Sequence, residues 1–209
     1  LSVLMVSTYP PDTDGIASYA ARLENALQKK GITIRIAANG RDWKRNSLSY
    51  IYSIIRKARS LKTDVVHVQL SYFMFGNEYY TGLFPLLSAG LKLLGKRVVI
   101  TLHDIVPKSD LTMDFLKNFT SPSFLRFKKW AFIKYTKIVC SIVDKIIVHS
   151  EVAKNVLIQD YGVPGRKIQI IPHGIDQNPF PVLKNDVKTN FNGPVVSYFG
   201  FVRKGKGLE

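Results

Sequence analysis

The pattern of apolar and polar positions predicts strands and helices that alternate along most of the chain. Short runs rich in Val, Ile and Leu are typical of strands buried in a parallel sheet. Between them, apolar residues recur at helical spacing with charged residues in the intervening positions. The predicted strands cover residues 2–7, 32–38, 64–69, 97–102, 144–149 and 167–171. The predicted helices cover residues 16–27, 50–58, 79–94, 122–142 and 151–161.

This alternation predicts an α/β fold, a Rossmann-like, doubly wound and mainly parallel sheet with helices on both faces. Residues 1–176 form this predicted domain. Prolines, asparagines and sparse apolar periodicity indicate a linker at 177–193. Another apolar strand and a glycine-rich loop then occupy residues 194–209. A strand and loop without a following helix are not a stable unit, so we expect 194–209 to be the first part of a second α/β domain.

Two glycine-containing loops follow predicted strands and are candidate ligand sites. Gly15 lies between the first strand and the first helix, where backbone N–H groups and the lack of a Cβ allow an anion or a sugar to approach. A plain turn is the alternative. The loop Gly200–Gly207 carries Arg203 and Lys206 and nearly matches a P-loop, but Gly207 stands in the place of the Mg²⁺-binding Ser or Thr. We therefore expect phosphate binding without a true P-loop, with a basic surface turn as the alternative.

Three of the four histidines end or follow strands. His103 directly follows a strand at the ligand-facing edge, where it could donate a hydrogen bond or polarise a substrate; an exposed or capping histidine is the alternative. His149 ends a strand and His173 lies in a Pro-His-Gly turn, whereas His67 lies within a strand and is predicted to be core. No histidine pair has the spacing of a metal site, so no bound metal is expected.

The net charge of +15 indicates a polyanionic neighbour, such as an anionic bilayer, a nucleic acid or a phosphorylated substrate. The helix 122–142 combines an aromatic stripe with lysines and could lie on an anionic membrane, although packing against the core with a solvated basic face is the favoured alternative. A nucleic-acid role rests on charge alone, so no specific nucleic-acid partner is expected. The single cysteine, Cys140, is predicted to be a buried, inert thiol, which fits a reducing compartment.

Five stretches occur along the chain in this order: P-P-x-x-x-G-I ending at Ile16, Thr101–Asp104, Ile147–Glu151, Ile171–Asp176 and Phe199–Gly207. Together they resemble the GT-B-fold retaining glycosyltransferases of family 4, also called glycosyl transferase group 1. The resemblance covers the whole chain.

The resemblance implies that the chain is the N-terminal half of a GT-B fold, with an acceptor-side domain followed by the start of a donor-binding domain. By carry-over, Arg203 and Lys206 hold the donor diphosphate, Gly15 lies beside donor and acceptor, and His103 lies near the donor sugar as the catalytic candidate. Two departures stand out. Asp14 replaces the first of the two glycines usual in the first loop, and Arg203 lies two positions beyond its commonest place.

The resemblance predicts transfer of a sugar from a nucleotide-diphosphate donor to a glycan or lipid-linked acceptor, with no cofactor and no metal. The E-x7-E element of such enzymes lies in the second domain, so the fragment alone is expected to be inactive. A cytoplasmic location is expected, peripheral on the inner face of the membrane if the basic helix binds there. The alternative is a non-catalytic Rossmann-like binding module that docks an acidic partner or a membrane.

Overall fold

The structure is a computed structural model that describes residues 1–112, 125–174 and 193–194. Internal contacts divide the chain into two units, Leu1–His173 and Gly174–Glu209. All described helices and strands belong to the first unit. The predicted linker and the predicted strand after it fall almost entirely outside the described residues, so the proposed domain boundaries stay predictions.

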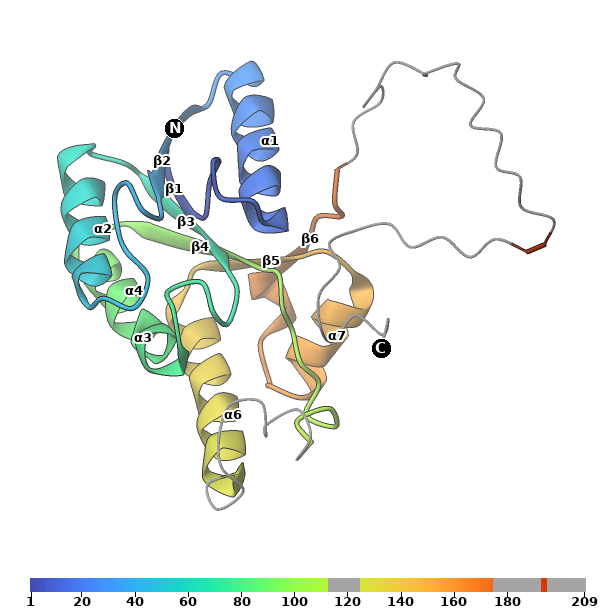
Figure 1. The fold of residues 1–209 in the computed structure, drawn as a ribbon. Coiled ribbons are helices and arrows are strands. Elements are labelled where there is room, and N and C mark those ends of the chain that lie inside the picture. Colours follow the sequence, from blue (N-terminus) through green and yellow to red (C-terminus); the bar gives the residue numbers. More distant parts are fainter. Residues whose placement is uncertain (113–124, 175–192, 195–209) are drawn as a thin grey trace. The chain divides into compact units, whose positions relative to one another are not determined.

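Six parallel strands form one sheet in the order β2-β1-β3-β4-β5-β6 (Figure 1). This arrangement confirms the predicted Rossmann-like, mainly parallel α/β fold. The strands are β1 (Ser2–Ser7), β2 (Thr33–Ala38), β3 (Val65–Leu70), β4 (Arg97–Leu102), β5 (Lys145–Val148) and β6 (Ile168–Ile170).

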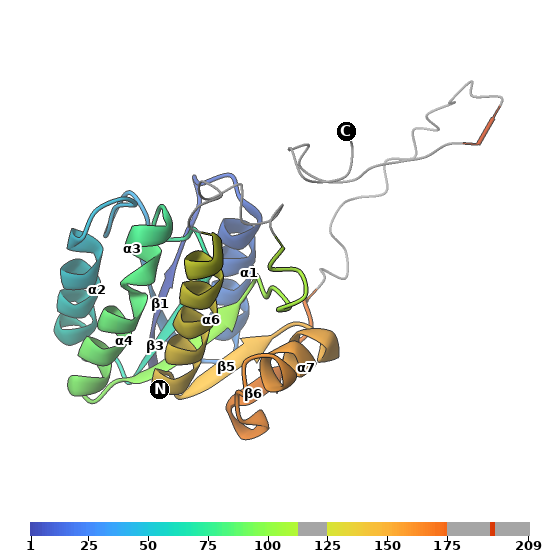
Figure 2. The ribbon, with the colours of Figure 1, turned by 90° about the horizontal axis from the view of Figure 1, so that it is seen from below.

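The helices cover both faces of the sheet, as the doubly wound prediction requires. Helix α1 lies on one face, and α2, α4, α6 and α7 lie on the other (Figures 1 and 2). Right-handed crossovers explain this division, because the chain moves one way from β1 to β2 and the opposite way through the later strands. The helices are α1 (Gly15–Lys29), α2 (Ser49–Ser60), α3 (Glu78–Gly82), α4 (Phe84–Leu93), α6 (Leu125–Ile142) and α7 (Glu151–Gln159), with a 3₁₀ turn at Gly165–Lys167.

The central residues of strand β1, Val3–Val6, are all apolar because they contribute to two hydrophobic clusters. Successive side chains of a strand point to opposite faces. Val3 and Met5 pack in the smaller cluster with Ala20 of α1, whereas Leu4 and Val6 belong to the larger cluster on the other face. Burial on both faces explains why the run shows no alternation.

The run 79–94, predicted as one buried helix, forms two helices instead. Helix α3 ends and α4 begins on either side of Leu83, and Pro85 lies in the first turn of α4. Proline has no N–H and its ring clashes with the preceding turn, so it is tolerated at a helix start and not in a helix interior. The run is also less buried than predicted, because Tyr79 and Leu93 remain 73% and 89% exposed.

The polar loop predicted at 39–46 contains a core residue. The indole of Trp43 is buried at 2% exposure and donates from Nε1 to the Ala37 carbonyl oxygen at 3.0 Å. Its ring packs beside Phe75. A tertiary contact therefore places this indole in the core. The local pattern of polar residues does not predict that contact.

Cys140 is buried, as predicted, and burial raises the pKa of its thiol to about 12. Such a thiol is a poor nucleophile at neutral pH. Within the described ranges, no helix has the length and apolar character needed to cross a membrane.

Candidate functional site

The candidate site lies where the parallel strands end, next to the start of α1. Strands β1 and β3 are neighbours, but the helices that follow them leave toward opposite faces of the sheet (Figure 1). Ligands of open α/β sheets bind at such a switch point, beyond the carboxyl ends of the strands. The ends of β1, β3, β4 and β5 and the first turn of α1 therefore frame the site.

Asp14 organises the loop between β1 and α1. It is the N-cap of α1, and its Oδ1 accepts hydrogen bonds from the Ala17 N–H at 2.7 Å and the Thr8 hydroxyl at 2.9 Å. Its other oxygen lies 3.8 Å from Arg45 Nη2. A carboxylate thus already occupies the positive end of α1, where an anionic ligand would bind. This geometry favours a neutral ligand group, such as a sugar hydroxyl, over a phosphate at this helix end.

Gly15 is the first residue of α1 and is exposed. A Cβ built on Gly15 would meet no heavy atom within 4 Å. The surrounding protein therefore does not require glycine here, and the open space beside it is available to a ligand.

Three histidine rings converge at this edge of the sheet around Tyr19 of α1. His103 follows β4, His149 follows β5, and His173 lies just beyond β6. The Tyr19 ring lies 5.2–5.5 Å from each of the three imidazoles in edge-to-face contact. His149 and His173 stack with ring centres 3.7 Å apart. Residues that are far apart in the sequence thus form one aromatic cluster.

A chain of hydrogen bonds fixes the orientation of His103. Its Nε2 lies 2.9 Å from Gln69 Oε1, which can only accept, so the proton of neutral His103 is on Nε2. The amide nitrogen of Gln69 faces the thioether of Met5 at 3.5 Å and His67 Nε2 at 3.3 Å. His67 Nε2 in turn lies 2.8 Å from the Thr101 hydroxyl. The other ring nitrogen of His103, Nδ1, is therefore the one that can accept a hydrogen bond from a ligand.

The imidazoles of His67 and His103 are uncharged at neutral pH. Burial lowers the pKa of His103 to about 4, and the neighbouring His149 and His173 act in the same direction. Asp104 and Asp14 oppose this shift without cancelling it. Burial likewise lowers the pKa of His67 to about 4, and it lowers the pKa of His173. His103 is thus a neutral acceptor at Nδ1, rather than a cation or an acid.

His149 presents a second unused acceptor. Its Nδ1 donates to the Ile171 carbonyl oxygen at 2.8 Å, which leaves the lone pair on Nε2. That Nε2 atom is buried and has no hydrogen-bond partner within the described part of the chain. Since an unpaired buried polar atom is costly, a hydroxyl donor from a ligand would stabilise it. Two imidazole acceptors beside an aromatic ring suit a neutral ligand rich in hydroxyl groups.

The structure brings Gly15 and His103 to the same edge of the sheet and adds residues that the sequence analysis did not assign to the site. From the sequence, Tyr19 belongs only to the predicted helix 16–27 and Gln69 only to the predicted strand 64–69. The sequence predicts no role for His149 or His173. The sequence signal that could have identified His149 and His173 is their position at or just beyond the ends of parallel strands.

His67, which was predicted to be core and not part of the site, is buried at 8% exposure. Arg203 and Lys206 lie outside the described residues, so their roles stay predictions. Among residues 1–112, 125–174 and 193–194, no cluster of three His, Cys, Asp or Glu side chains could hold a metal ion.

Comparison with known proteins found one family match. The model of the family described as Glycosyltransferase Family 4 matches residues 13–178, which is well over half of the 209-residue chain. The curated proteins compared with the chain gave no match.

Proposed function

We propose, from the premise that this chain belongs to glycosyltransferase family 4, that it takes a sugar from a nucleotide-diphosphate donor and transfers it to a glycan or lipid-linked acceptor with retention of configuration. Membership of the family makes glycosyl transfer its general activity. The observation that supports the finer proposal is the pair of unused acceptors, His103 Nδ1 and His149 Nε2, beside Tyr19. This arrangement matches the hydroxyl donors of a sugar.

In this proposal, His103 contacts the donor sugar and is the catalytic candidate. Its neutral imidazole accepts a hydrogen bond from a sugar hydroxyl, while Gln69 acts as a positioning residue by holding the ring and its tautomer. Gly15 leaves room for the substrate at the start of α1. Such contacts accelerate the reaction by orienting the reacting carbon of the sugar.

The leaving diphosphate requires positive charge, and the Arg45 cation at the described site is already paired with the Asp14 carboxylate. We assign this role to Arg203 and Lys206, whose cations would stabilise the charge that develops as the glycosidic bond to the nucleotide breaks. No metal or other cofactor is needed in this scheme. We further propose a cytoplasmic enzyme that is peripheral on the inner face of the membrane.

Substitution of His103 by Ala tests the proposal in the full-length protein. We expect kcat/KM for sugar transfer to fall about 10- to 100-fold, because one hydrogen bond to the sugar is lost at the reacting centre. The assay would cover a small panel of nucleotide sugars, with thermal unfolding measured in parallel. A folded variant with unchanged turnover would contradict the catalytic role of His103.

A non-catalytic binding module is the second candidate function, because α6 carries five cations and no acidic residue. This candidate predicts that the full-length protein neither transfers nor hydrolyses any sugar nucleotide. It also predicts binding to an acidic partner that His103→Ala leaves intact. Turnover of a single donor by the wild type would reject it.

A further inference from the structure

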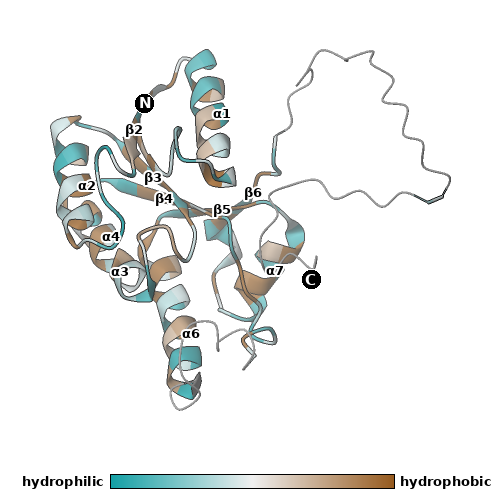
Figure 3. Ribbon diagram, viewed as in Figure 1, coloured by the Kyte–Doolittle hydropathy of each residue, from teal (hydrophilic) through white to brown (hydrophobic). Residues whose placement is uncertain are grey.

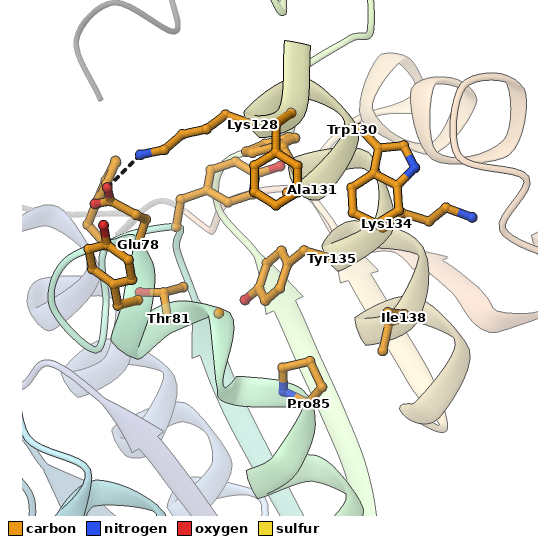
Figure 4. A pocket seen from close by; sticks show the side chains of 15 residues that line it. Glu78, Thr81, Pro85, Lys128, Trp130, Ala131, Lys134, Tyr135 and Ile138 are labelled. Carbon is orange, nitrogen blue, oxygen red and sulfur yellow. Dashed lines mark hydrogen bonds and ion pairs between the residues drawn. The ribbon is translucent and has the colours of Figure 1, made fainter. Parts of the chain in front are cut away.

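A groove of about 500 Å³ lies between α3 and α6, on the face of the sheet opposite α1 (Figures 1 and 4). Most of its lining is apolar or aromatic, including Tyr72, Pro85, Phe132 and Ile138. Lys128 and Glu78 form an ion pair of 2.8 Å at one end of the groove, as the dashed line in Figure 4 shows. The groove is large enough for a small ligand and is separate from the histidine cluster.

Two buried hydroxyls in the lining lack hydrogen-bond partners among the described residues. They are Thr81 Oγ1 of α3 and the phenol oxygen of Tyr135 of α6. An unpaired buried hydroxyl costs free energy, which a polar atom of a bound molecule would recover. The groove therefore fits a molecule with a mainly apolar body and a few polar atoms.

The outer surface of α6 has the character of a membrane-interface helix. Phe127 and Trp130 are 62% and 55% exposed and stack on each other with ring centres 5.8 Å apart. Lys134 Nζ lies 6.0 Å from the centre of the Trp130 ring. Brown and teal segments alternate along α6 in Figure 3. Exposed aromatic rings among cations suit the interface of an anionic bilayer.

We propose that the groove between α3 and α6 binds the hydrocarbon tail of an anionic membrane lipid while α6 lies on the bilayer surface. Charge complementarity favours this occupant, because α6 contributes only cations and the whole chain carries a net charge of +15. The apolar lining receives the tail, and the free hydroxyls receive the polar atoms where tail and headgroup meet. The further step, that this lipid is the sugar acceptor, rests on the proposed function.

The two tryptophans of the chain provide a direct assay, because Trp130 is exposed on α6 and Trp43 is buried in the core. The 209-residue chain would be mixed with phosphatidylglycerol vesicles whose acyl chains are brominated, since bromine quenches indole fluorescence at short range. We expect quenching and a blue shift with phosphatidylglycerol and neither with phosphatidylcholine. The Trp130→Phe variant, which keeps Trp43, should lose the response.

Two variants separate binding in the groove from adsorption on the surface. A Cβ on Gly82, which lines the groove, meets no heavy atom within 4 Å, so Gly82→Leu fills the groove without a clash at Cβ. We expect it to weaken vesicle partitioning several-fold, whereas Ala26→Leu on the exposed surface of α1 should have no effect. The double variant Lys134→Glu/Lys137→Glu should weaken partitioning about tenfold or more. The matched change Lys29→Glu/Lys30→Glu, at the last residue of α1 and its C-cap, should weaken it much less.

Each result supports or overturns the proposal. Absence of quenching overturns it. Equal partitioning of the Gly82→Leu and Ala26→Leu variants also overturns it, because the protein would then adsorb to the vesicle surface without binding a lipid in the groove. Concentration-dependent dimerisation that Gly82→Leu abolishes would assign the groove to a second copy of the chain. Lipid binding without sugar transfer would support the groove and reject the proposed function, whereas sugar transfer without lipid binding would do the reverse.

Discussion

At the scale of single residues, hydrogen bonding determines what the histidines at the sheet edge can do. Gln69 Oε1 accepts a hydrogen bond from His103 Nε2–H, which leaves Nδ1 of His103 as an acceptor. The Ile171 carbonyl does the same for His149 with the nitrogens reversed. The sequence predicts that His103 donates a hydrogen bond or polarises a substrate, whereas this tautomer favours acceptance of a hydrogen bond from a hydroxyl.

The substitution Gly15→Ala tests whether a ligand uses the open space at the start of α1. Gly15 has no left-handed φ, and a Cβ there meets nothing, so alanine should raise the free energy of unfolding by up to about 1 kcal/mol. We expect kcat/KM to fall nevertheless, because the added methyl group occupies the space of the substrate. Gly165→Ala, remote from the site, is the control; a Gly15→Ala enzyme with full activity would contradict a ligand contact.

The buried histidines predict a loss of stability in acid. The pKa values of His67 and His103 fall from 6.5 to about 4 on folding, so the unfolded chain binds more protons over this range. Their contribution is complete above pH 6.5 and is lost as the pH falls toward 4, with a slope of about 1.4 kcal/mol per pH unit for each proton. Urea unfolding of the chain from pH 7.5 to 4.5 would measure it. In the His67→Gln variant, the free energy of unfolding should depend less steeply on pH below 6.5. An unchanged slope would contradict burial of a neutral His67.

At the scale of elements, single polar side chains hold neighbouring strands and helices in register. Asp144, just before β5, accepts the Val98 N–H of β4 at 2.7 Å and the Lys92 ammonium of α4 at 2.6 Å. Ser150 caps α7 by accepting the Ala153 N–H at 3.1 Å. These contacts lie at element boundaries, where helices and strands leave backbone groups unpaired.

Substitution of Asp144 by Ala should lower the free energy of unfolding by about 1–2 kcal/mol, since a partly exposed carboxylate loses two hydrogen bonds. Burial raises the pKa of Asp144, but Lys92 and the Val98 N–H outweigh it and hold the pKa below 3.8. The stabilisation is therefore present above pH 3.8 and disappears as the pH falls through the lower folded-state pKa. Denaturant titrations at pH 7 and pH 3 would compare the variant with wild type. Equal stability of the variant and the wild type at pH 7 would show that the contacts of Asp144 with β4 and α4 do not stabilise the fold.

At the scale of the whole molecule, the first unit, Leu1–His173, carries the neutral, hydrogen-bond-accepting side of the proposed site. The cations proposed for the diphosphate, Arg203 and Lys206, belong to the second unit, Gly174–Glu209. By the family resemblance, the proposed chemistry also needs a further donor-binding element.

We therefore expect the 209-residue chain alone to show no sugar transfer with any donor, while a protein that includes a second α/β domain transfers from one nucleotide sugar. Radiolabelled sugar transfer to a lipid or glycan acceptor would measure both, with circular dichroism to show that the shorter chain is folded. Transfer by the folded 209-residue chain would contradict the need for the second domain.

The strands, their arrangement and the position of His103 were determined by the sequence alone. Apolar runs and helical periodicity predicted all six strands and their parallel α/β arrangement, because burial on both faces leaves a strong local pattern. The position of His103 directly after its strand predicted that it lies at the ligand-facing edge, because ligands of open α/β sheets bind beyond the carboxyl ends of the strands. The boundaries of the helices were predicted less well, since the run 79–94 forms two helices divided at Leu83.

Only the tertiary structure decided how distant residues meet. The contacts of Tyr19 with His103, His149 and His173 join a helix to the ends of three strands, and no local pattern encodes such distances. The tautomer of His103 depends on Gln69, a neighbour supplied by another strand. The groove between α3 and α6 likewise exists only because two helices pack side by side. Local physics therefore specified the elements, and their packing specified the chemistry.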